Sequence, residues 1–440
     1  MTALFDVLVI GGDEASLCAA ACGAKTGAHI GLVRLEKKRG VSSSGAIANI
    51  PNSVWRRLDL QNYGFALEPV SARITLFGEG AHVTTFPGAR ETKNALTEAG
   101  LEDGALWEDF IEDISRLDDD GLIVSTASGA FVEGAKRLAD LLGNPKALDR
   151  VGRLSGSCLA LLGDYFNDSR LKDHVAAHAL APMGYGGMES GSARALIEYL
   201  DEDAWRVRPV NNKGPLCEIL ETVCAHAGVE LFTSPGGAAF SDRGKNKEVR
   251  LDGDKKLKTR SIFFATPDAA IKAGAGKGSS GGGTATAVLQ LKLEKGGDTP
   301  DAEDKKAIFQ IIDSWGDLQT ASDAAAAGRL PENLPVEFEF DDHGGLIARS
   351  AYCPAAFYED GEWRGWTGQD RQAAEARIRA RLSQRLPGLA PLIRKSKIEI
   401  TGAQTGAGAV DCDDLIIQPH RHNAVSAAVK LMEKVIAGDR

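Results

Sequence analysis

Cysteine is scarce in this sequence, and its spacing matches no metal or redox motif. The 440 residues contain 7 cysteines, an odd and scattered set that does not form a disulfide framework in a chain of this size. No Cys-x-x-Cys pair occurs, which excludes the zinc-ribbon and thioredoxin classes. Cys18 and Cys22 lie one helical turn apart in an apolar stretch, so we expect both to be buried as small hydrophobic residues.

Long hydrophobic runs are also absent. The first apolar run, Ala3–Ile10, is interrupted by Asp6 and has no basic region before it. No segment reaches the roughly 18 apolar residues that a membrane span needs. The sequence therefore predicts a soluble, cytoplasmic protein without a transmembrane segment.

The chain lacks an excess of positive charge, since its net charge is −10. Nucleic-acid binding depends on clustered lysine and arginine that neutralise phosphates, so we expect no nucleic-acid partner. One dense basic cluster exists, and its sequence is typical of a solvated hairpin. It consists of Lys245, Lys247, Arg250, Lys255, Lys256, Lys258 and Arg260.

Glycine, in contrast, is abundant, with 50 residues in 440 against an average of about 7%. The first 36 residues use it in a strand–turn–helix–strand order typical of a dinucleotide-binding unit. In chain order the parts are a strand (Leu4–Ile10), a turn (Gly11 and Gly12), a helix (Asp13–Thr26) ended by Gly27, a second strand (His29–Leu35) and the acidic Glu36.

The turn itself departs from the Gly-x-Gly-x-x-Gly pattern. Its six positions are Gly11, Gly12, Asp13, Glu14, Ala15 and Ser16. The second glycine is replaced by Asp13, whose carboxylate would repel a diphosphate about 4 Å away by roughly 4 kcal/mol at an effective dielectric near 20. Alternatively, Asp13 or Glu14 satisfies the N–H groups of the helix in place of a phosphate. A nucleotide bound in a shifted or weakened mode and an empty site both remain open.

The rest of the chain alternates predicted helices and strands. The segment 53–205 is predicted to be largely helical, and a Gly/Ser loop at 274–283 does not match a P-loop because Ile271 stands at its first glycine position. Further helices are predicted at Lys213–Ala227, Ala302–Ser314, Ala373–Leu386 and Asn423–Ile436. Strands are predicted at Val229–Phe232 and Thr284–Leu293, with a hairpin of Glu248–Leu251 and Leu257–Arg260 and a following strand, Ser261–Ala265.

These elements predict an α/β fold. We expect a discontinuous FAD/NAD(P)-binding, Rossmann-like domain made of residues 1–52, 206–275 and 395–440. An α+β substrate domain is inserted in two pieces, residues 53–205 and 276–394.

At this level the chain resembles the phytoene desaturase-like branch of the FAD-dependent amine oxidase superfamily, which includes carotenoid and polyprenyl oxidoreductases. The likeness covers nearly the whole chain, and it rests on the order and spacing of several weak motifs. These are the opening strand–glycine–helix–strand–Glu unit, Pro51–Asp109, Arg208–Leu216, Ala225–Gly228, Thr259–Asp268, Asp323–Pro331, Ala351–Trp363 and Leu386–Leu389.

The resemblance implies a flavoprotein with FAD on the Rossmann-like part and an apolar substrate in the inserted part. It implies that Gly11 and Gly12 line the turn together with the four residues after them. It further implies that Glu36 holds the adenosine ribose, that Gly237 lies beside the adenine, and that His422 and Asn423 belong to the segment under the flavin. No catalytic side chain follows from it, because the flavin performs the redox chemistry.

Four cofactor-binding elements of the family are altered here. They are the Asp13/Ser16 positions of the turn, the Gly-Gly-Arg segment (here 38–42), a Gly-Gly pair (here Asn211-Asn212) and the stretch before the last helix (402–415, with Pro419-His420). The first hypothesis is an FAD-dependent oxidoreductase acting on a hydrophobic, isoprenoid or lipid-like substrate. The alternative is a flavin-free protein of the same fold that binds an apolar ligand or a protein partner, as Rab escort and GDP-dissociation-inhibitor proteins do; a homo-oligomer is also left open.

A few other residues suit more than one interpretation. His174 and His178 stand four apart on a predicted helix, and a surface or interface pair is favoured over a metal site because no third ligand stands at suitable spacing. Asp411–Asp414 is interpreted as an acidic solvated turn, and His420 and His422 as a loop before the last helix. An aromatic cluster either lines an apolar pocket or packs in the core; it comprises Tyr352, Phe357, Tyr358, Trp363 and Trp366.

Overall fold

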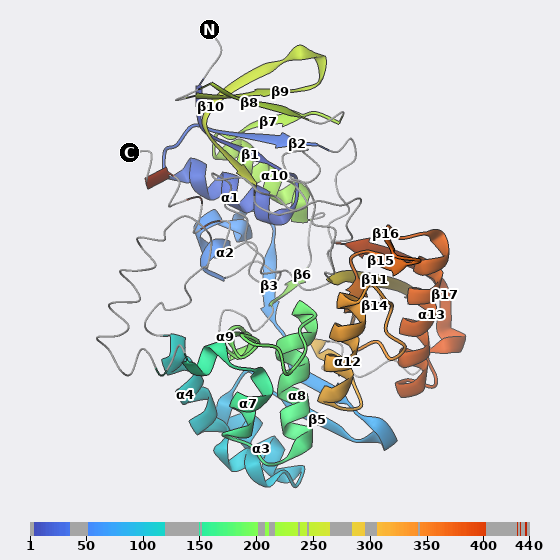
Figure 1. Cartoon of the computed structure of the whole chain (residues 1–440). Helices are drawn as coiled ribbons and strands as arrows, with labels where there is room; N and C mark the ends of the chain where they lie inside the picture. Colours follow the sequence, from blue (N-terminus) through green and yellow to red (C-terminus); the bar gives the residue numbers. More distant parts are fainter. Residues whose placement is uncertain are drawn as a thin grey trace.

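The computed structural model describes most of the chain and contains two large β-sheets joined by a short ribbon (Figure 1). The described residues are 4–35, 52–118, 149, 152–200, 207–210, 216–235, 238–243, 246–264, 284–294, 306–341, 344–401, 429, 432, 436 and 437. All structural statements below concern these residues.

The first sheet has six strands and contains the predicted dinucleotide unit. Its order is β7-β2-β1-β10-β9-β8. The first four strands run parallel to one another, and β9 and β8 continue antiparallel. In sheet order the strands are β7 (Glu230–Thr233), β2 (Ile30–Arg34), β1 (Leu4–Ile10), β10 (Lys256–Phe264), β9 (Asn246–Arg250) and β8 (Ala239–Arg243), and the one-turn helix η6 (Asp252–Asp254) lies between β9 and β10.

Helices α1 (Glu14–Lys25) and α10 (Leu216–His226) pack on this sheet, and α2 (Asn52–Leu58) packs on α1. Helix α1 is buried from Ala15 to Gly23, because its many alanines let it press closely against the sheet and against α10. Gly31 of β2 is needed for the same close approach, since a Cβ there would lie 2.7 Å from Leu8 Cδ1. The apolar face shared by α1, α10 and the strands forms one core.

A two-stranded antiparallel ribbon lies between the six-stranded sheet and the rest of the molecule (Figure 1). It is formed by β3 (Ala66–Pro69) and β6 (Val207–Val210), which are far apart in the sequence. The short helix η1 (Leu60–Tyr63) leads into β3. The ribbon thus pairs two segments in which the chain passes from one sheet to the other.

The second sheet has seven strands in the order β17-β11-β14-β13-β12-β4-β5. All neighbours are antiparallel except β12 and β4, which run parallel. The strands are β17 (Ile393–Thr401), β11 (Thr284–Leu293), β14 (Gly345–Pro354), β13 (Val336–Phe340), β12 (Ile308–Ile311), β4 (Arg73–Leu76) and β5 (His82–Thr85).

Helices surround this second sheet, and their apolar residues form the largest core of the molecule. Figure 1 shows α12 and α13 beside β11, β14 and β17, and the remaining helices gathered below the ribbon. The helices are α3 (Ala89–Glu98), α4 (Trp107–Asp118), α7 (Cys158–Gly163), α8 (Ser169–Leu180), α9 (Arg194–Leu200), α12 (Trp315–Ala326) and α13 (Gly368–Arg385), with the one-turn helices η2 (Gly78–Gly80), η3 (Glu102–Leu106), η4 (Ala181–Met183) and η8 (Ala390–Leu392) and the hairpin β15 (Phe357–Glu359)–β16 (Glu362–Arg364).

Most of the predicted elements are confirmed. The strands and helix of the opening unit, the helix α10, the strands β7 and β11, the β9–β10 hairpin and the helix α13 lie where the sequence predicts them. Gly27 ends α1 with a φ of +90° and donates its N–H to Ala24 O. Cys18 and Cys22 are fully buried, as predicted.

Two predictions are wrong. Residues 308–311, expected to be helical, form β12, because tertiary contacts pair this buried Ile-Phe-Gln-Ile run with β13 and β4 on either side. Residues 257–264, expected to belong to two separate strands, lie in the single strand β10. The segment 53–205 is largely helical over its described residues, as predicted, and it also contains the short strands β3, β4 and β5.

Other expectations fall outside the described residues or are left untested. The 274–283 loop and most of the predicted last helix lie outside the described residues, and the domain boundaries stay a prediction. Within the described ranges, no helix is long and apolar enough to cross a membrane.

Candidate nucleotide-binding turn

The turn between β1 and α1 has a backbone that only glycine adopts readily at its first position. Gly11 has a φ of +148°, a region that L side chains rarely occupy. Its N–H donates to Val33 O at 2.9 Å, which ties the end of β1 to the neighbouring strand β2. The turn thus lies at the carboxyl end of the parallel strands, where ligands bind in open α/β sheets.

The second position, Gly12, lies against an arginine side chain. A Cβ added to Gly12 would be 2.9 Å from Arg34 Cγ and 3.1 Å from Arg34 Cδ. Any other residue here would push the Arg34 side chain away. Because Gly12 has no side chain, the Arg34 side chain can lie beside the turn.

Asp13 caps helix α1. Its backbone is extended, with φ −80° and ψ 172°, and its Oδ1 accepts the N–H of Ser16 at 2.8 Å. This is the cap that the sequence suggested as an alternative to a phosphate, and such a cap stabilises a helix by about 1 kcal/mol. One N–H group at the helix start is thus already bonded to a carboxylate of the chain.

The last two positions of the turn are buried against the sheet. Ala15 and Ser16 are small and lie inside the core that α1 shares with α10. The Ser16 hydroxyl is buried and has no hydrogen-bond partner among the described residues. Ser16 thus keeps the close packing that the third glycine of a Gly-x-Gly-x-x-Gly turn provides, and it adds a polar atom.

Arg34, the last residue of β2, extends from the turn to helix α10. Its Nη1 donates to Glu221 Oε1 at 2.5 Å, and its Nη2 lies 3.5 Å from the Thr233 hydroxyl. Its Nε–H is buried and bonds to none of the described residues. The guanidinium therefore has a donor to spare beside the turn.

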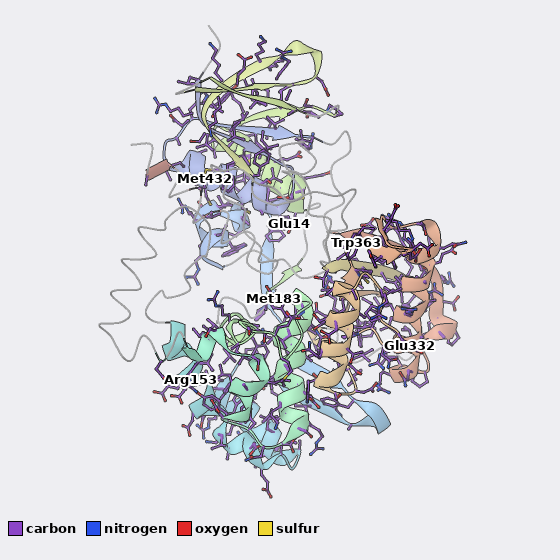
Figure 2. All side chains as sticks on the ribbon, in the orientation of Figure 1. Glu14, Arg153, Met183, Glu332, Trp363 and Met432 are labelled. Atoms are coloured by element: carbon purple, nitrogen blue, oxygen red, sulfur yellow. The ribbon has the colours of Figure 1, made fainter. Side chains whose placement is uncertain are left out.

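Negative charge dominates the surroundings of the turn. Burial raises the pKa of the Cys217 thiol on α10 to about 12, and the charges of three carboxylates add to this shift, in the order Glu14, Asp13 and Glu221. Asp13 and Glu14 stand at the start of α1, and Glu221 lies on α10, which packs against α1. Figure 2 shows Glu14 on the side of the six-stranded sheet that faces the ribbon and the second sheet.

The structure therefore brings together six of the predicted site residues: Gly11, Gly12, Asp13, Glu14, Ala15 and Ser16. The other four, Glu36, Gly237, His422 and Asn423, lie outside the described residues. The altered segments 38–42, 211–212 and 402–415, together with Asp411–Asp414 and His420, lie outside them as well.

Sequence reasoning missed Arg34, Glu221 and Thr233. Arg34 carried a signal, because it is a charged residue at the end of an otherwise apolar strand that leads to the turn. Glu221 carried none, since it is one of two acids on an amphipathic helix and only the packing of α10 beside α1 brings it to the turn.

His174 and His178 do not form the predicted surface or interface pair. Both are buried on α8, and the His174 ring nitrogens hydrogen-bond to the hydroxyls of Thr75 at 2.8 Å and Thr85 at 2.9 Å. Burial, followed by the charge of Arg73, lowers the pKa of His174 to about 3. The prediction of exposure was wrong because α8 packs these residues against β4 and β5. Over the described part of the chain, no three potential metal ligands come together.

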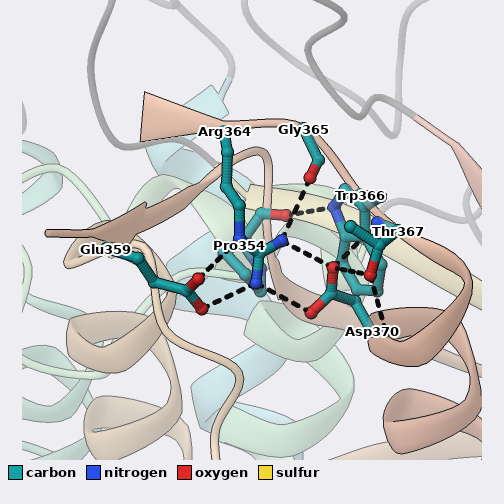
Figure 3. A network of polar contacts seen from close by, with 7 residues as sticks. All are labelled: Pro354, Glu359, Arg364, Gly365, Trp366, Thr367 and Asp370. Carbon is teal, nitrogen blue, oxygen red and sulfur yellow. Dashed lines mark hydrogen bonds and ion pairs between the residues drawn. The ribbon is translucent and has the colours of Figure 1, made fainter. Parts of the chain in front are cut away.

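The aromatic residues near 352–366 form two separate ring pairs rather than one cluster. Tyr358 pairs with Trp363, and Phe357 with Trp366, at centroid distances of 5.1 Å and 5.0 Å. Figure 3 shows the network beside them, in which Arg364 donates to the carboxylates of Glu359 and Asp370. Thr367 N also donates to Asp370 at the start of α13. These contacts hold the β15–β16 hairpin on α13.

Comparison with known proteins gives a likeness of fold. No protein-family model matches the chain, and no curated protein is similar to it in sequence. Among solved structures, a putrescine oxidase with a redesigned cofactor site matches 99% of each chain with a TM-score of 0.56 at 14% identity. Cyclohexylamine oxidase from Brevibacterium oxydans matches 99% of each chain with a TM-score of 0.55 at 11% identity.

The chain has the amine-oxidase fold. The same fold is found in the Rab GDI of Plasmodium falciparum, which matches all of this chain and 99% of its own with a TM-score of 0.53 at 10% identity. The predicted fold class, an α/β flavoprotein fold with a Rossmann-like sheet and a second α+β part, is thereby confirmed. At these identities the likeness concerns architecture alone.

Proposed function

We propose that the chain is an FAD-dependent oxidoreductase of the phytoene desaturase-like kind, with a hydrophobic, isoprenoid or lipid-like substrate. The amine-oxidase fold over the full chain carries this proposal, because two of the similar structures are oxidases. The order of the sequence motifs supports the finer assignment to the phytoene desaturase-like branch.

The residues of the turn fit the diphosphate of an adenine dinucleotide in three respects. Gly11 and Gly12 present backbone without side chains, Ser16 is small, and Arg34 has a spare N–H beside the turn. Bound there, FAD would supply the redox chemistry. The chain's own residues would bind and orient the adenine end.

Asp13 is the group that weakens this fit. Its charge lies at the helix start, where the diphosphate would bind, and repels it. Since one N–H of the helix start is already bonded to Asp13, the nucleotide has fewer donors than in a glycine turn. FAD binding should therefore be weaker than a Gly-x-Gly-x-x-Gly turn permits.

The test is the colour of the purified protein and its titration with FAD. A yellow preparation with absorbance at about 450 nm, or uptake of added FAD, supports the proposal. A colourless protein that takes up no added FAD would overturn it.

A matched pair of variants tests the role of Asp13. Asp13→Asn removes the charge but keeps a good helix cap, and it should tighten FAD binding by about tenfold or more. Asp168→Asn makes the same change at the start of α8, where Asp168 Oδ1 accepts the N–H groups of Arg170 and Leu171. That control should leave FAD binding unchanged. Equal binding by Asp13→Asn and the unsubstituted protein would contradict the electrostatic argument.

A second candidate function is a flavin-free protein that binds an apolar ligand or a protein partner. The observation that favours it is the Asp13 cap, in which a carboxylate already bonds the helix N-terminus. The likeness to a Rab GDI shows that this fold is not confined to oxidases. Mass spectrometry of an organic extract of the purified protein would reveal a bound lipid in place of flavin.

A further inference from the structure

Arg34 lies beside the turn, although no sequence motif includes it. The strands β1 and β2 are parallel and in register, with Ile10 beside Val33. Arg34 therefore extends one residue beyond the last pair, at the level of the glycines. Its Cγ and Cδ lie over Gly12, and its guanidinium continues toward α10.

The charges around the turn give this arginine a specific role. Asp13 and Glu14 stand at the start of α1, and Glu221 lies on α10, which packs against α1. A phosphate at the turn meets negatively charged side chains from both helices, and like charges repel strongly where water is partly excluded. Arg34 brings a positive charge to the same place, where its Nη1 lies 2.5 Å from Glu221 Oε1.

The guanidinium also has the donors that a phosphate requires. An arginine presents five N–H groups in a planar fork that matches phosphate oxygens. Here Nη1 bonds to Glu221, Nη2 is 3.5 Å from Thr233, and Nε is buried with no partner among the described residues. A rotation of the side chain about its stem exchanges the carboxylate of Glu221 for another anion without moving β2.

We propose that Arg34 is the phosphate-binding cation of this turn, held by Glu221 in the structure described here and transferred to the phosphate of an adenine nucleotide on binding. Glu221 then competes with the nucleotide for Arg34. This inference rests on the proposed function only in assuming that an adenine nucleotide binds at the turn. It assigns phosphate binding at this turn to a residue of the neighbouring strand β2.

The experiment is calorimetric titration of the full chain with ADP, which carries the adenosine and diphosphate of FAD without the flavin. Arg34→Met should weaken ADP binding by about tenfold or more, because a charge-assisted hydrogen bond is lost. Arg34→Lys should restore part of the affinity, since it keeps the charge but not the fork. Glu221→Gln should tighten binding by roughly threefold or more, because the competing charge is removed.

Two controls make the same chemical changes in the same sheet. Arg260→Met removes an arginine of β10 whose Nη1 is 3.1 Å from Asp6 Oδ1, and Glu230→Gln removes an acid of β7 that is 3.0 Å from His29 Nε2. Both should leave the ADP affinity unchanged. Thermal unfolding of every variant shows whether a loss of binding reflects a loss of folding, and Glu221→Gln keeps the test valid if Arg34→Met does not fold.

The outcomes separate this inference from the proposed function. If Arg34→Met binds ADP as tightly as the unsubstituted protein, or more tightly, Arg34 is not a phosphate ligand and the inference fails. It also fails if neither the unsubstituted protein nor Glu221→Gln binds ADP. If ADP binding depends on Arg34 but no FAD is taken up, the inference stands and the oxidoreductase proposal fails.

Discussion

Two arginines in the two sheets make similar ion pairs but differ in what surrounds them. Arg349 of β14 lies in the seven-stranded sheet between Glu337, at 3.4 Å, and Glu339, at 2.6 Å, both on β13. Arg34 of β2 lies at the end of the six-stranded sheet and reaches Glu221 on a helix. The first pairing is fixed by strand register, since Glu337 is directly opposite Arg349. The second is fixed only by helix packing.

This difference separates a structural ion pair from one that is suited to binding. The Arg349 group is nearly closed to water, and Gln310 Nε2 adds a hydrogen bond to Glu337 at 3.0 Å. The Arg34 side chain is 24% exposed and keeps a spare donor. Of these two arginines, Arg34 lies at the end of a strand and has a donor free for another anion. Arg349 lies between paired strands and is held by two carboxylates.

The sharpest test of this comparison is Arg349→Met. It removes the arginine that pairs with two buried carboxylates, which should cost about 3–5 kcal/mol of unfolding free energy. Urea denaturation measures this cost. A loss of less than 1 kcal/mol would show that the pair is not the closed group described here.

The buried His174 gives the seven-stranded sheet a pH dependence. Its pKa is lowered to about 3, so the unfolded chain binds more protons between pH 6.5 and 3. This group alone should lower the stability by roughly 3 kcal/mol from pH 6.5 to 4. Burial raises the pKa of the adjacent Asp173 to about 6, which acts in the opposite direction because that stability is lost as pH rises from 3.8 to 6. Asp173 offsets roughly 2 kcal/mol of the loss over the same interval, so acid should destabilise by about 1 kcal/mol.

The check is urea denaturation at pH 7 and pH 4.5. His174→Gln should lose this fall and gain stability at the lower pH, because the raised pKa of Asp173 remains. The matched change His226→Gln, at an exposed histidine of α10 near Tyr63, should keep the acid response of the unsubstituted protein. An unchanged acid response in His174→Gln would contradict the assignment.

Arg34→Met should cost far less stability than Arg349→Met, about 1 kcal/mol, because Arg34 and Glu221 are partly hydrated. A double-mutant cycle with Glu221→Gln isolates the coupling between the two side chains. If Arg34→Met were as destabilising as Arg349→Met, the contrast between a structural pair and a binding pair would be lost.

The smallest effect is expected at Arg364, which contacts two carboxylates as Arg349 does but on the surface (Figure 3). Arg364→Met should lower the free energy of unfolding by less than about 1 kcal/mol, since exposed ion pairs contribute little. Its guanidinium also lies 4.6 Å from the centre of the Phe357 ring, a contact that methionine retains in part. Denaturation in low and high salt shows whether the remaining contribution is electrostatic.

Much of the fold could be predicted from local patterns. The opening unit was predictable because a buried parallel strand, a glycine turn and an alanine-rich helix each leave a strong periodic signal. The Asp13 cap was predictable because it depends on residues three positions apart. Strand β12 was not, since three apolar residues and a glutamine next to helix formers give no signal until β13 and β4 pair with them.

The site was predictable only in part, because some of its residues are brought together by long-range packing and leave no local signal. The sequence by itself determined the glycine turn, its acidic third position and the small residues that let α1 approach the sheet, because all of these act over a few neighbouring residues. The tertiary structure alone decided that Arg34 lies over Gly12 and that Glu221, 187 positions further along the chain, holds it. Long-range packing sets the distances between charges, and those distances determine whether a glycine-rich turn receives a phosphate or repels it.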